Sequence, residues 1–365
     1  MRGQPAHAPS EKFLALDGLR GLAAILVVYH HQHLAGINDA PAGAYLAVDL
    51  FFLMSGFVIG HAYERRLETG MTPMAFMRLR LIRLYPLYIL GSAAGLAIAA
   101  AFGRLSQLHP ASATELLRAT GSAIGFIPYF STDPTVNAFP LNGPGWSLFF
   151  ELAANLVYAI FAVRLSTRAL ALLSLGSGML LVWFAWHGGD LNLGFRTVGF
   201  IGGLPRVGFS FFGGVVLYRL HRGGRLLKLR ADPLWAILAA LVLLTLPMRG
   251  GPSWIQALAV VMIGFPAMLV LAIASAAPSP RLARLFAWSG ELSYPLYAIH
   301  GPIIVGFGMM SRFGGFPISA FQPWIGLLLA PALALLALPL SRRYDQPVRA
   351  WLTERLAFRR RYATA

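Results

Sequence analysis

The stretch LALDGLRGLAAILVVYHHQHL, residues 14–34, decides how the whole chain is interpreted. It is apolar over nearly the roughly 20 positions that an α-helix needs to cross the hydrocarbon core of a bilayer. It nevertheless carries Asp17 and Arg20 near its start and three histidines near its end. Ionisable side chains are costly inside a membrane and usually face a cavity, so this stretch predicts both a membrane span and a functional site.

The spacing within the stretch singles out one of the three histidines. The eleven steps from Arg20 to His31 make roughly three turns plus 20° at about 100° per residue. His31 is therefore expected on the same helix face as Arg20, roughly 16 Å further along the axis. His30 lies about 80° to one side and His33 well round the other, so this face selects His31.

The composition extends the membrane interpretation to the whole chain. Hydrophobic residues make up 57% of the 365 positions and charged residues only 12%, and the mean hydropathy is +0.64. These values exclude an ordinary soluble protein and predict an all-α, polytopic integral membrane protein embedded in the lipid bilayer. There is no cysteine, which excludes disulfides and thiolate chemistry. The formal charge of +16 lies in short loops between apolar runs, so no nucleic-acid partner is expected.

Apolar runs of membrane-spanning length recur along the chain. We expect about 10 transmembrane helices, at residues 13–34, 43–62, 84–103, 144–164, 169–187, 203–221, 233–248, 253–275, 291–310 and 323–341. A weaker patch at 119–130 contains Pro128 and is expected to be re-entrant or interfacial. The chain then divides into an N-terminal segment (1–12), a transmembrane domain (13–341) and a basic tail (342–365).

The distribution of basic residues predicts the orientation of the chain. With the N-terminus inside, 24 of the 30 lysines and arginines fall in inner segments, and the outer side keeps Arg104, Arg118, Arg196, Arg206, Arg249 and Arg312. This fourfold bias follows the positive-inside rule. We therefore expect a multi-pass protein whose two termini are both cytoplasmic.

Polar residues on three predicted spans are expected at similar depth in the outer half of the membrane. They are His31 on the first span, Asp49 on the second, and Ser147 and Glu151 one turn apart on the fourth. A histidine beside a carboxylate in a poorly solvated cavity is suited to general base catalysis. The set predicts a catalytic centre, although the same groups could simply hydrogen-bond the helices together.

Arginines at the inner end of the third span form a second candidate group. Arg80 and Arg83, in RLRLIRLYPLYIL, are three residues apart on one helix face. Guanidinium groups bind phosphates through paired hydrogen bonds. The alternative is that these arginines only fix topology and contact lipid head groups.

The remaining candidates carry weaker signals. The segment GELSYPLYAIHGPI, residues 290–303, places Tyr294 and His300 on the ninth span; a lone histidine there is more often a packed hydrogen-bonding residue than a base. Trp146 also fits an interfacial aromatic belt. No metal site is expected, because the first-span histidines lack a second ligand cluster and the chain has no HExxH motif.

Taken together, these motifs resemble the membrane-bound acyltransferase family 3, integral proteins that O-acylate polysaccharides, lipid-linked sugars and small molecules. The resemblance covers most of the chain, through FLALDGLRGLAAILVVYHH (13–31), VDLFFLMSGFVI (48–59), RLIRLYPLY (80–88), WSLFFELAANLVY (146–158), GELSYPLYAIHGPI (290–303) and YDQPVRAWL (344–352). One departure is visible, because the family's terminal glutamate-x-proline is Asp345-Gln346-Pro347 here.

The resemblance carries the family's motifs onto specific positions of this chain. The arginine–histidine pattern falls on Arg20 and His31, and the RxxR element on Arg80 and Arg83. The tryptophan-serine-leucine segment with its glutamate falls on Trp146, Ser147 and Glu151, and the late serine-tyrosine segment on Ser293, Tyr294 and His300.

The function implied by the resemblance is O-acylation at a bacterial cell inner membrane. A short acyl group, most simply acetyl, would move from cytoplasmic acetyl-CoA or another acyl-CoA to a hydroxyl of a cell-surface glycan or related acceptor, without a metal. In this scheme Arg80 and Arg83 hold the donor, and His31 takes the acceptor proton or carries the acyl group transiently. Asp49 or Glu151 orients His31, and the substrate-binding residues are Arg20, Trp146, Ser147, Tyr294 and His300.

The alternative is a transporter or flippase of a glycan or lipid-linked intermediate without covalent chemistry. It would use the same buried polar residues as a permeation path. The sequence shows no inverted repeat and no matching pair of broken helices, which argues against it. The sequence predicts no particular oligomeric state.

Overall fold

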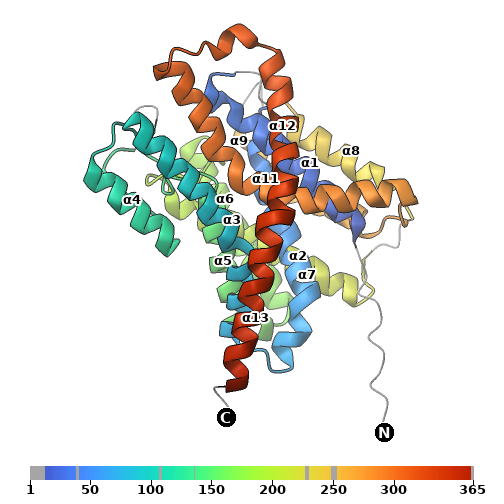
Figure 1. The fold of residues 1–365 in the computed structure, drawn as a ribbon. Helices are drawn as coiled ribbons and strands as arrows, with labels where there is room; N and C mark the ends of the chain where they lie inside the picture. Colours follow the sequence, from blue (N-terminus) through green and yellow to red (C-terminus); the bar gives the residue numbers. More distant parts are fainter. Residues whose placement is uncertain are drawn as a thin grey trace.

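The described part of the chain is built almost entirely of helices. The computed structural model describes residues 13–37, 41–106, 109–134, 136–226, 230–247 and 253–362, and all their side chains except those of Ser319 and residues 356–362. Within these ranges the β features are isolated bridges. The predicted all-α fold is therefore confirmed (Figure 1).

A helix coincides with each of the ten predicted spans. In chain order the helices are α1 (Leu14–His31), α2 (Ala47–Glu68), α3 (Pro73–Phe102), α5 (Gly145–Ile160), α6 (Thr167–Gly188), α7 (Gly203–Arg222), α8 (Leu234–Thr245), α9 (Ser253–Ala259) running through the π-helical turn η5 (Val260–Gly264) into α10 (Phe265–Ile273), α11 (Pro280–Phe313) and α12 (Trp324–Leu340). The remaining helices are η1 (Gln32–Ala35), η2 (Ala44–Leu46), α4 (Ala113–Gly125), η3 (Ala162–Arg164), η4 (Phe200–Gly202), η6 (Ile318–Phe321), η7 (Ser341–Asp345) and α13 (Gln346–Tyr362).

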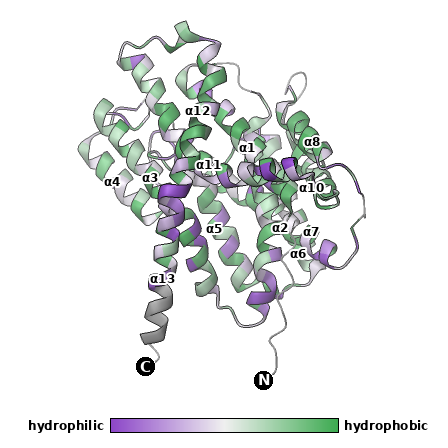
Figure 2. Ribbon diagram, turned by 45° about the vertical axis from the view of Figure 1, so that its right-hand side comes forward, coloured by the Kyte–Doolittle hydropathy of each residue, from purple (hydrophilic) through white to green (hydrophobic). Residues whose placement is uncertain are grey.

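Length and composition make the chain a polytopic membrane protein. Among the described residues, six helical segments are long and apolar enough to cross a membrane: Ala44–Glu68, Pro73–Phe102, Thr167–Gly188, Phe200–Arg222, Ser253–Ile273 and Trp324–Arg355. Two shorter apolar helices, α5 and α8, accompany them. Apolar residues dominate most of these helices, whereas α13 is largely hydrophilic (Figure 2). The exact number of ten spans stays a prediction.

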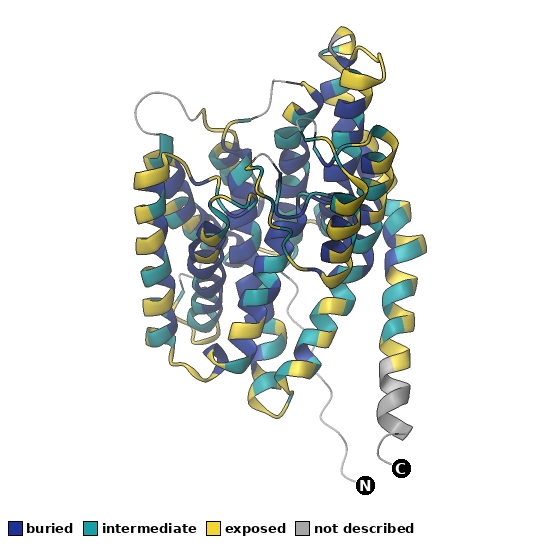
Figure 3. Cartoon of the chain, turned by 90° about the vertical axis from the view of Figure 1, so that its left-hand side faces the viewer, coloured by how far each residue is buried: buried dark blue, intermediate teal, exposed yellow. Residues whose placement is uncertain are grey.

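The helices differ sharply in how much of their surface is covered by protein. Over the most apolar part of each helix, 78% of α2 is buried and only 28% of α6. Outward-facing side chains such as Leu172 and Leu335 remain 70% and 72% exposed. In Figure 3 such exposed positions line the peripheral helices, while the buried ones gather at the centre. Apolar surface on this scale suits contact with lipid, with α2 at the core of the bundle.

Glycines allow the central helices to approach closely. A Cβ added at Gly56 of α2 would lie 1.9 Å from the carbonyl oxygen of Phe211 on α7, and one at Gly214 would lie 2.1 Å from that of Leu53. Small residues at such crossings are typical of membrane helices, because association there depends on close packing. These contacts fix α2 against α7 beside the candidate site.

A buried ionic network connects α2 to α5 and α7 near the C-terminal end of α2. Glu64 near the end of α2 is 2% exposed. It accepts hydrogen bonds from Arg219 Nε of α7 and Tyr158 Oη of α5, both at 2.9 Å. The network joins α2, α5 and α7 through one carboxylate, which is satisfied by several donors as a buried charge requires.

Helix α3 begins earlier than the sequence predicts. Thr72 caps it by accepting a hydrogen bond from Ala75 N at 3.2 Å, and Pro73 occupies its first turn. The helix continues for 30 residues to Gly103, whose φ of +62° ends it. Arg80 and Arg83 therefore lie within the helix rather than before it, and the helix holds them rigidly.

The segment between α3 and α5, residues 104–143, folds over one end of the bundle and is called the cap. Its helix α4 starts with a capping box, in which Ser112 and Glu115 each accept from the other's backbone N–H. With 13 residues, α4 is too short to span a bilayer. His109 lies 2.7 Å from Asp133 through Nδ1 and 2.8 Å from Glu115 through Nε2. His109 therefore links the start of the cap to α4 through Glu115 and to the segment after α4 through Asp133.

The predicted basic tail is helical up to Tyr362. Helix α12 continues through η7 into α13, so that the three form one long rod along the molecule (Figure 1). Asp345 in η7 is buried and lies 3.2 Å from Arg349 Nε one turn later. Glu291 of α11 pairs with Arg342 at 2.9 Å. The second ion pair attaches η7, just before α13, to α11, whereas the first lies within the rod.

Candidate active site

Two adjoining cavities hold most of the residues that the sequence singles out. The first has a volume of about 80 Å³ and contains Arg20, Arg80 and Arg83; we call it the arginine cavity. The second has a volume of about 380 Å³ and contains His30, His31 and His33; we call it the histidine cavity. Both are lined by Val48 and Tyr297, so these two side chains form the partition between them.

Helix α1 contributes residues to both cavities. Arg20 lines the arginine cavity and His31, three turns later, lines the histidine cavity. The helix is fixed at its crossing with α11, where a Cβ on Gly21 would lie 1.7 Å from Ser289 Oγ. The predicted shared face of Arg20 and His31 is therefore the wall of two successive chambers.

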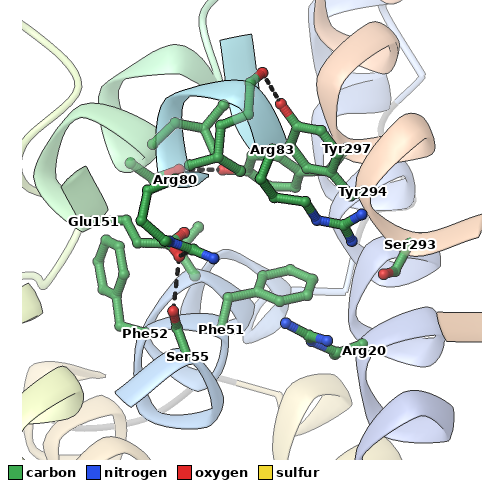
Figure 4. A pocket seen from close by; sticks show the side chains of 14 residues that line it. Arg20, Phe51, Phe52, Ser55, Arg80, Arg83, Glu151, Ser293, Tyr294 and Tyr297 are labelled. Atoms are coloured by element: carbon green, nitrogen blue, oxygen red, sulfur yellow. Dashed lines mark hydrogen bonds and ion pairs between the residues drawn. The ribbon is translucent and has the colours of Figure 1, made fainter. Parts of the chain in front are cut away.

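The arginine cavity gathers positive charge from two helices. Arg20 of α1 and both Arg80 and Arg83 of α3 converge on it (Figure 4). Arg80 donates to Glu151 Oε1 at 2.6 Å. A terminal nitrogen of Arg20 lies 4.0 Å from Asp17 Oδ1, and the Asp17 side chain is 38% exposed. The cavity thus offers several guanidinium groups against few carboxylates, which suits an anion such as phosphate.

Glu151 lies in the arginine cavity and not beside His31. Its Oε1 accepts from Arg80 and also from Ser55 Oγ at 2.7 Å. His31, Asp49, Ser147 and Glu151 are therefore not gathered in one cavity, because Ser147 and Glu151 line the arginine cavity whereas His31 lines the histidine cavity. Their predicted common face on α5 is confirmed.

A hydrogen bond closes the partition between the cavities. Ser147 Oγ lies 2.6 Å from Tyr297 Oη and 3.1 Å from the carbonyl oxygen of Pro144. Because a carbonyl can only accept, Ser147 donates to Pro144 and Tyr297 donates to Ser147. The phenol is held across the boundary between the chambers, and moving it would widen the connection.

The proton positions on the histidine pair follow from its neighbours. His31 Nδ1 is 2.9 Å from the carbonyl oxygen of Val27, and His300 Nδ1 is 2.8 Å from that of Tyr297. A carbonyl oxygen only accepts, so both Nδ1 atoms carry a proton. His300 Nε2 is then an acceptor 3.3 Å from His31 Nδ1. The lone pair of His31 then lies on Nε2, and His31 lines the histidine cavity.

His300 is entirely buried, and its ring contacts His31 at a centroid distance of 4.9 Å. It does not line either cavity among the described residues. His300 therefore lies next to His31 and outside the described linings of both cavities. The expected carboxylate partner of His31 is replaced by this second imidazole.

Asp49 has a different partner from the one expected. The Asp49 side chain is wholly buried and accepts two hydrogen bonds from Arg206 of α7, one from Nε at 3.1 Å and one from a terminal nitrogen at 2.5 Å. Arg206 itself is only 1% exposed. The same guanidinium lies 5.1 Å from the Trp146 ring centroid and donates to the carbonyl oxygen of Leu193 at 2.9 Å. Asp49 thus holds Arg206 and, through it, Trp146.

Trp146 and Tyr294 lie in different chambers. Trp146 lines the histidine cavity, and its ring packs on Gly194, where φ is +99° and an added Cβ would lie 2.7 Å from the ring. Tyr294 lines the arginine cavity, with the Arg83 guanidinium 5.7 Å from its ring centroid. Tyr294 Oη donates to the carbonyl oxygen of Leu84, which ties α11 to α3.

Three residues of the site were not selected from the sequence. Arg206 was counted only as an outer basic residue, although a lone arginine in an apolar run facing Asp49 in another is itself a signal of pairing. Tyr297 was noted in the segment 290–303 but given no role, and Ser55 gave no signal, because hydroxyls are common in membrane helices. Among the described residues, no group of three or more potential ligands is arranged to hold a metal ion.

The fold and the two cavities define a polytopic membrane protein with a histidine centre next to a cationic chamber. Residues 13–341 match the acyltransferase domain of the acyltransferase 3 family. The chain belongs to this family, and the protein is a membrane-bound acyltransferase.

Three curated proteins illustrate the relationship. "Protein 2 in picA locus" of Rhizobium radiobacter is 38% identical over 189 residues, 48% of this chain and 96% of that protein. A candidate membrane-bound transacylase of Komagataeibacter xylinus, BcsY, is 28% identical over 316 residues, 81% and 74% of the two chains. The exopolysaccharide production protein ExoZ of Rhizobium meliloti (strain 1021) is 35% identical over 115 residues, 32% of each chain. No solved structure matches.

Proposed function

We propose that this acyltransferase moves a short acyl group, most simply acetyl, from cytoplasmic acyl-CoA to a hydroxyl of a cell-surface glycan. The observation that carries this proposal is the adjacency of the arginine and histidine cavities at Val48 and Tyr297. An anionic donor requires cationic side chains, which line the arginine cavity, and a hydroxyl acceptor requires a base, which His31 supplies in the histidine cavity. The donor's acyl end would meet the acceptor at the partition.

The arginine cavity is the proposed site of the donor. Coenzyme A is polyanionic, and Arg20 and Arg83 would bind its phosphate oxygens through charge-assisted hydrogen bonds. Arg80 would join them while Glu151 and Ser55 hold its guanidinium in place. Glu151 is then a positioning residue for Arg80. Its proposed role differs from the orientation of His31 that the sequence suggested.

His31 is the proposed general base. The acceptor oxygen would bond to the thioester carbonyl carbon while its proton passes to Nε2 of His31. The carbon–sulfur bond then breaks, and the leaving thiolate of CoA takes that proton. His300 keeps the His31 ring oriented and shares its Nδ1 proton, since the two nitrogens lie 3.3 Å apart. His300 is therefore proposed as a positioning residue.

The histidine cavity is the proposed site of the acceptor. Aromatic rings of Trp146, Tyr45 and Phe195 line it. Such rings offer flat apolar faces against which the C–H faces of a sugar can pack, while the neighbouring polar groups fix orientation. Asp49 contributes indirectly, by holding the Arg206 guanidinium against Trp146.

We infer that the histidine cavity faces the outside of a bacterial inner membrane and that both termini are cytoplasmic. The fourfold excess of basic residues in the predicted inner segments supports this orientation. Donor would then enter from the side on which acyl-CoA is made. The acceptor would enter from the side on which surface glycans are presented.

Mass spectrometry of cell-envelope glycans tests the proposal. Deletion of the gene should remove an acyl mass from one glycan, and the wild-type gene should restore it. His31→Ala should fail to restore it, whereas His187→Ala, a change at an exposed histidine on α6, should succeed. An unchanged set of acyl masses in the deletion strain would contradict the proposed function.

A further inference from the structure

The proposed acyl transfer needs a hydrogen-bond donor for the thioester oxygen. As the acceptor oxygen bonds to the carbonyl carbon, one electron pair of the C=O bond moves onto the carbonyl oxygen, which becomes negatively charged. A preorganised donor aimed at that oxygen commonly supplies a large part of the rate enhancement. His31 acts on the acceptor hydroxyl, so the donor for the carbonyl oxygen is a different side chain at the boundary between the cavities.

Tyr297 is the side chain at that boundary that can donate. Among the described residues, only Val48 and Tyr297 line both the arginine cavity and the histidine cavity. A valine side chain has no hydrogen-bond donor, whereas the phenol of tyrosine has one. Figure 4 shows Tyr297 among the side chains around the arginine cavity. A thioester that reaches from one cavity towards the other therefore passes Tyr297.

One turn of α11 holds Tyr297 next to the histidine pair. His300 Nδ1 donates to the carbonyl oxygen of Tyr297 at 2.8 Å, and the centroids of the two rings lie 5.6 Å apart. His300 in turn contacts His31. Phe51 of α2 makes an edge-to-face contact with the Tyr297 ring, at a centroid distance of 5.6 Å. The phenol is thereby fixed relative to the proposed base, as preorganisation requires.

The hydroxyl of Tyr297 can change partners without leaving a donor unpaired. It donates to Ser147 Oγ at 2.6 Å, while Ser147 donates to the carbonyl oxygen of Pro144 at 3.1 Å. If Tyr297 turns its proton to a substrate oxygen, Ser147 keeps its own donor bond and loses only an accepted one. Hydrogen bonds to an ionised oxygen are stronger than those between neutral groups, so the exchange becomes favourable as charge develops.

The surroundings favour a neutral donor of this kind. Arg206 lines the histidine cavity, but it donates to both carboxylate oxygens of Asp49. Apolar side chains, including Phe51 and Phe52, line the arginine cavity together with Tyr297. A hydrogen bond to a developing charge is worth more in such poorly solvated surroundings than in water.

We propose that the Tyr297 hydroxyl donates a hydrogen bond to the carbonyl oxygen of the acyl donor and stabilises the negative charge that develops there. This inference rests on the proposed function and adds a catalytic residue to it. Tyr297 stays protonated throughout, because the acceptor's proton goes to His31 and then to the departing thiolate. When the carbon–sulfur bond breaks, the electron pair on oxygen re-forms the C=O bond, and Tyr297 turns back to Ser147.

Infrared spectroscopy tests the hydrogen bond without catalysis. Acetyl-CoA with an isotopic carbon at its carbonyl is bound to the His31→Ala protein in lipid vesicles, and its C=O stretch is isolated by subtracting the spectrum with unlabelled acetyl-CoA. A hydrogen bond weakens the C=O bond, so we expect the stretch at lower wavenumber than in the His31→Ala/Tyr297→Phe protein. An identical stretch in the two proteins would overturn the inference.

A second tyrosine provides the matched control. Tyr85 Oη donates to the carbonyl oxygen of Ile124 at 2.7 Å, and Tyr85 lies outside the described linings of both cavities. His31→Ala/Tyr85→Phe should therefore keep the lower wavenumber of the His31→Ala protein. Loss of the shift in this control as well would overturn the assignment of the hydrogen bond to Tyr297.

Rates of acetyl transfer separate a catalytic role from a structural one. Tyr297→Phe should lower kcat about 10²–10³-fold, as removal of one oxyanion donor does. The KM for acetyl-CoA should change little, because before charge develops the new bond only replaces the one to Ser147. Ser147→Ala breaks the same bond from its other side and should lower kcat by less than about tenfold. Equal losses in the two variants would show that this bond only joins α5 to α11, and would overturn the inference.

The two measurements separate this inference from the proposed function. A stretch that depends on Tyr297, without acyl transfer by the protein with intact His31, would sink the proposed function and leave the hydrogen bond standing. Acyl transfer together with a stretch that Tyr297→Phe does not change would do the reverse. Failure of acetyl-CoA to bind at all would overturn both.

Discussion

At the scale of single residues, two carbonyl oxygens determine the chemistry available to His31. They place a proton on Nδ1 of both His31 and His300, so the lone pair of His31 Nε2 is left for an acceptor hydroxyl. Ion pairs likewise determine the roles of the carboxylates of Asp49 and Glu151. Asp49 and Glu151 each hold an arginine instead of an imidazole.

The Asp49–Arg206 pair gives a sharp stability prediction. Asp49→Asn should destabilise the protein by about 3–5 kcal/mol, because it leaves a buried guanidinium without its counter-charge. Arg206→Met added to it should recover much of the loss. Thermal unfolding in detergent checks this, with Asp190→Asn, an exposed carboxylate, as the control. Equal losses for Asp49→Asn and Asp190→Asn would contradict the assignment.

The sequence predicted Arg20 and His31 because both lie on one helix, whose geometry is local. It missed the pairing of Asp49 with Arg206 and of His31 with His300, which join residues 157 and 269 positions apart. Such partners are chosen by helix packing, which no spacing within a single span reveals. The partners of Glu151, which are Arg80 and Ser55, were missed for the same reason.

At the scale of elements, close helix crossings should be sensitive to single added methyl groups. Gly56→Ala should destabilise the bundle by about 1–3 kcal/mol, because the new Cβ would press on the Phe211 backbone rather than on a movable side chain. Gly176→Ala on α6 is the matched control, since nothing lies within 4 Å of its Cβ. Unfolding temperatures of the two variants in the same detergent check this.

A neutral Gly56→Ala would show that α2 and α7 do not cross as closely as described. The control should be neutral or slightly stabilising, because alanine favours helix over glycine by about 1 kcal/mol. Helix positions themselves were predictable, since apolar runs of this length leave few alternatives. The crossings were not, because glycines are frequent throughout the chain.

The cap should respond to pH through its histidine clasp. Hydrogen bonding to Glu115 raises the pKa of His109 above its ordinary 6.5, with Asp133 adding to the effect. Hydrogen bonds from the Ser112 backbone and then from His109 lower the pKa of Glu115 to about 2. Stabilisation by His109 is complete below pH 6.5 and is lost as pH rises through its raised pKa.

Stabilisation by Glu115 has the opposite dependence, since it is present above pH 4.5 and lost as pH falls towards 2. The cap should therefore be tightest between pH 4.5 and 6.5. Amide hydrogen exchange of residues 111–126, corrected for intrinsic rates, should accelerate above the His109 pKa. His109→Gln should abolish that acceleration, and a pH-independent wild type would contradict the clasp.

At the scale of the whole molecule, the orientation can be tested with the natural chain as background, because it contains no cysteine. Thr114→Cys in the cap and Thr353→Cys in α13 are both exposed positions. In intact cells permeabilised only at the outer membrane, an impermeant maleimide should label the first and not the second. The reverse pattern would invert the assignment of donor and acceptor sides.

The two cavities lie next to each other because one helix lines both of them. One helix, α1, carries an arginine into one chamber and a histidine into the next, and Tyr297 stands between them. Composition and motif order were sufficient to predict a membrane acyltransferase. The division into two cavities, and the arginines that line the histidine cavity, depend on how distant helices and cap segments meet.

The central claim is that His31 accepts the acceptor's proton as acyl transfer occurs between these chambers. Its most direct test is the rate at which purified protein in vesicles moves label from radiolabelled acetyl-CoA to extracted envelope glycan. Wild type and His187→Ala should transfer label at equal rates, and His31→Ala should be slower by about 10²–10⁴-fold, the range expected for loss of a general base. Transfer by His31→Ala at the wild-type rate would contradict the account.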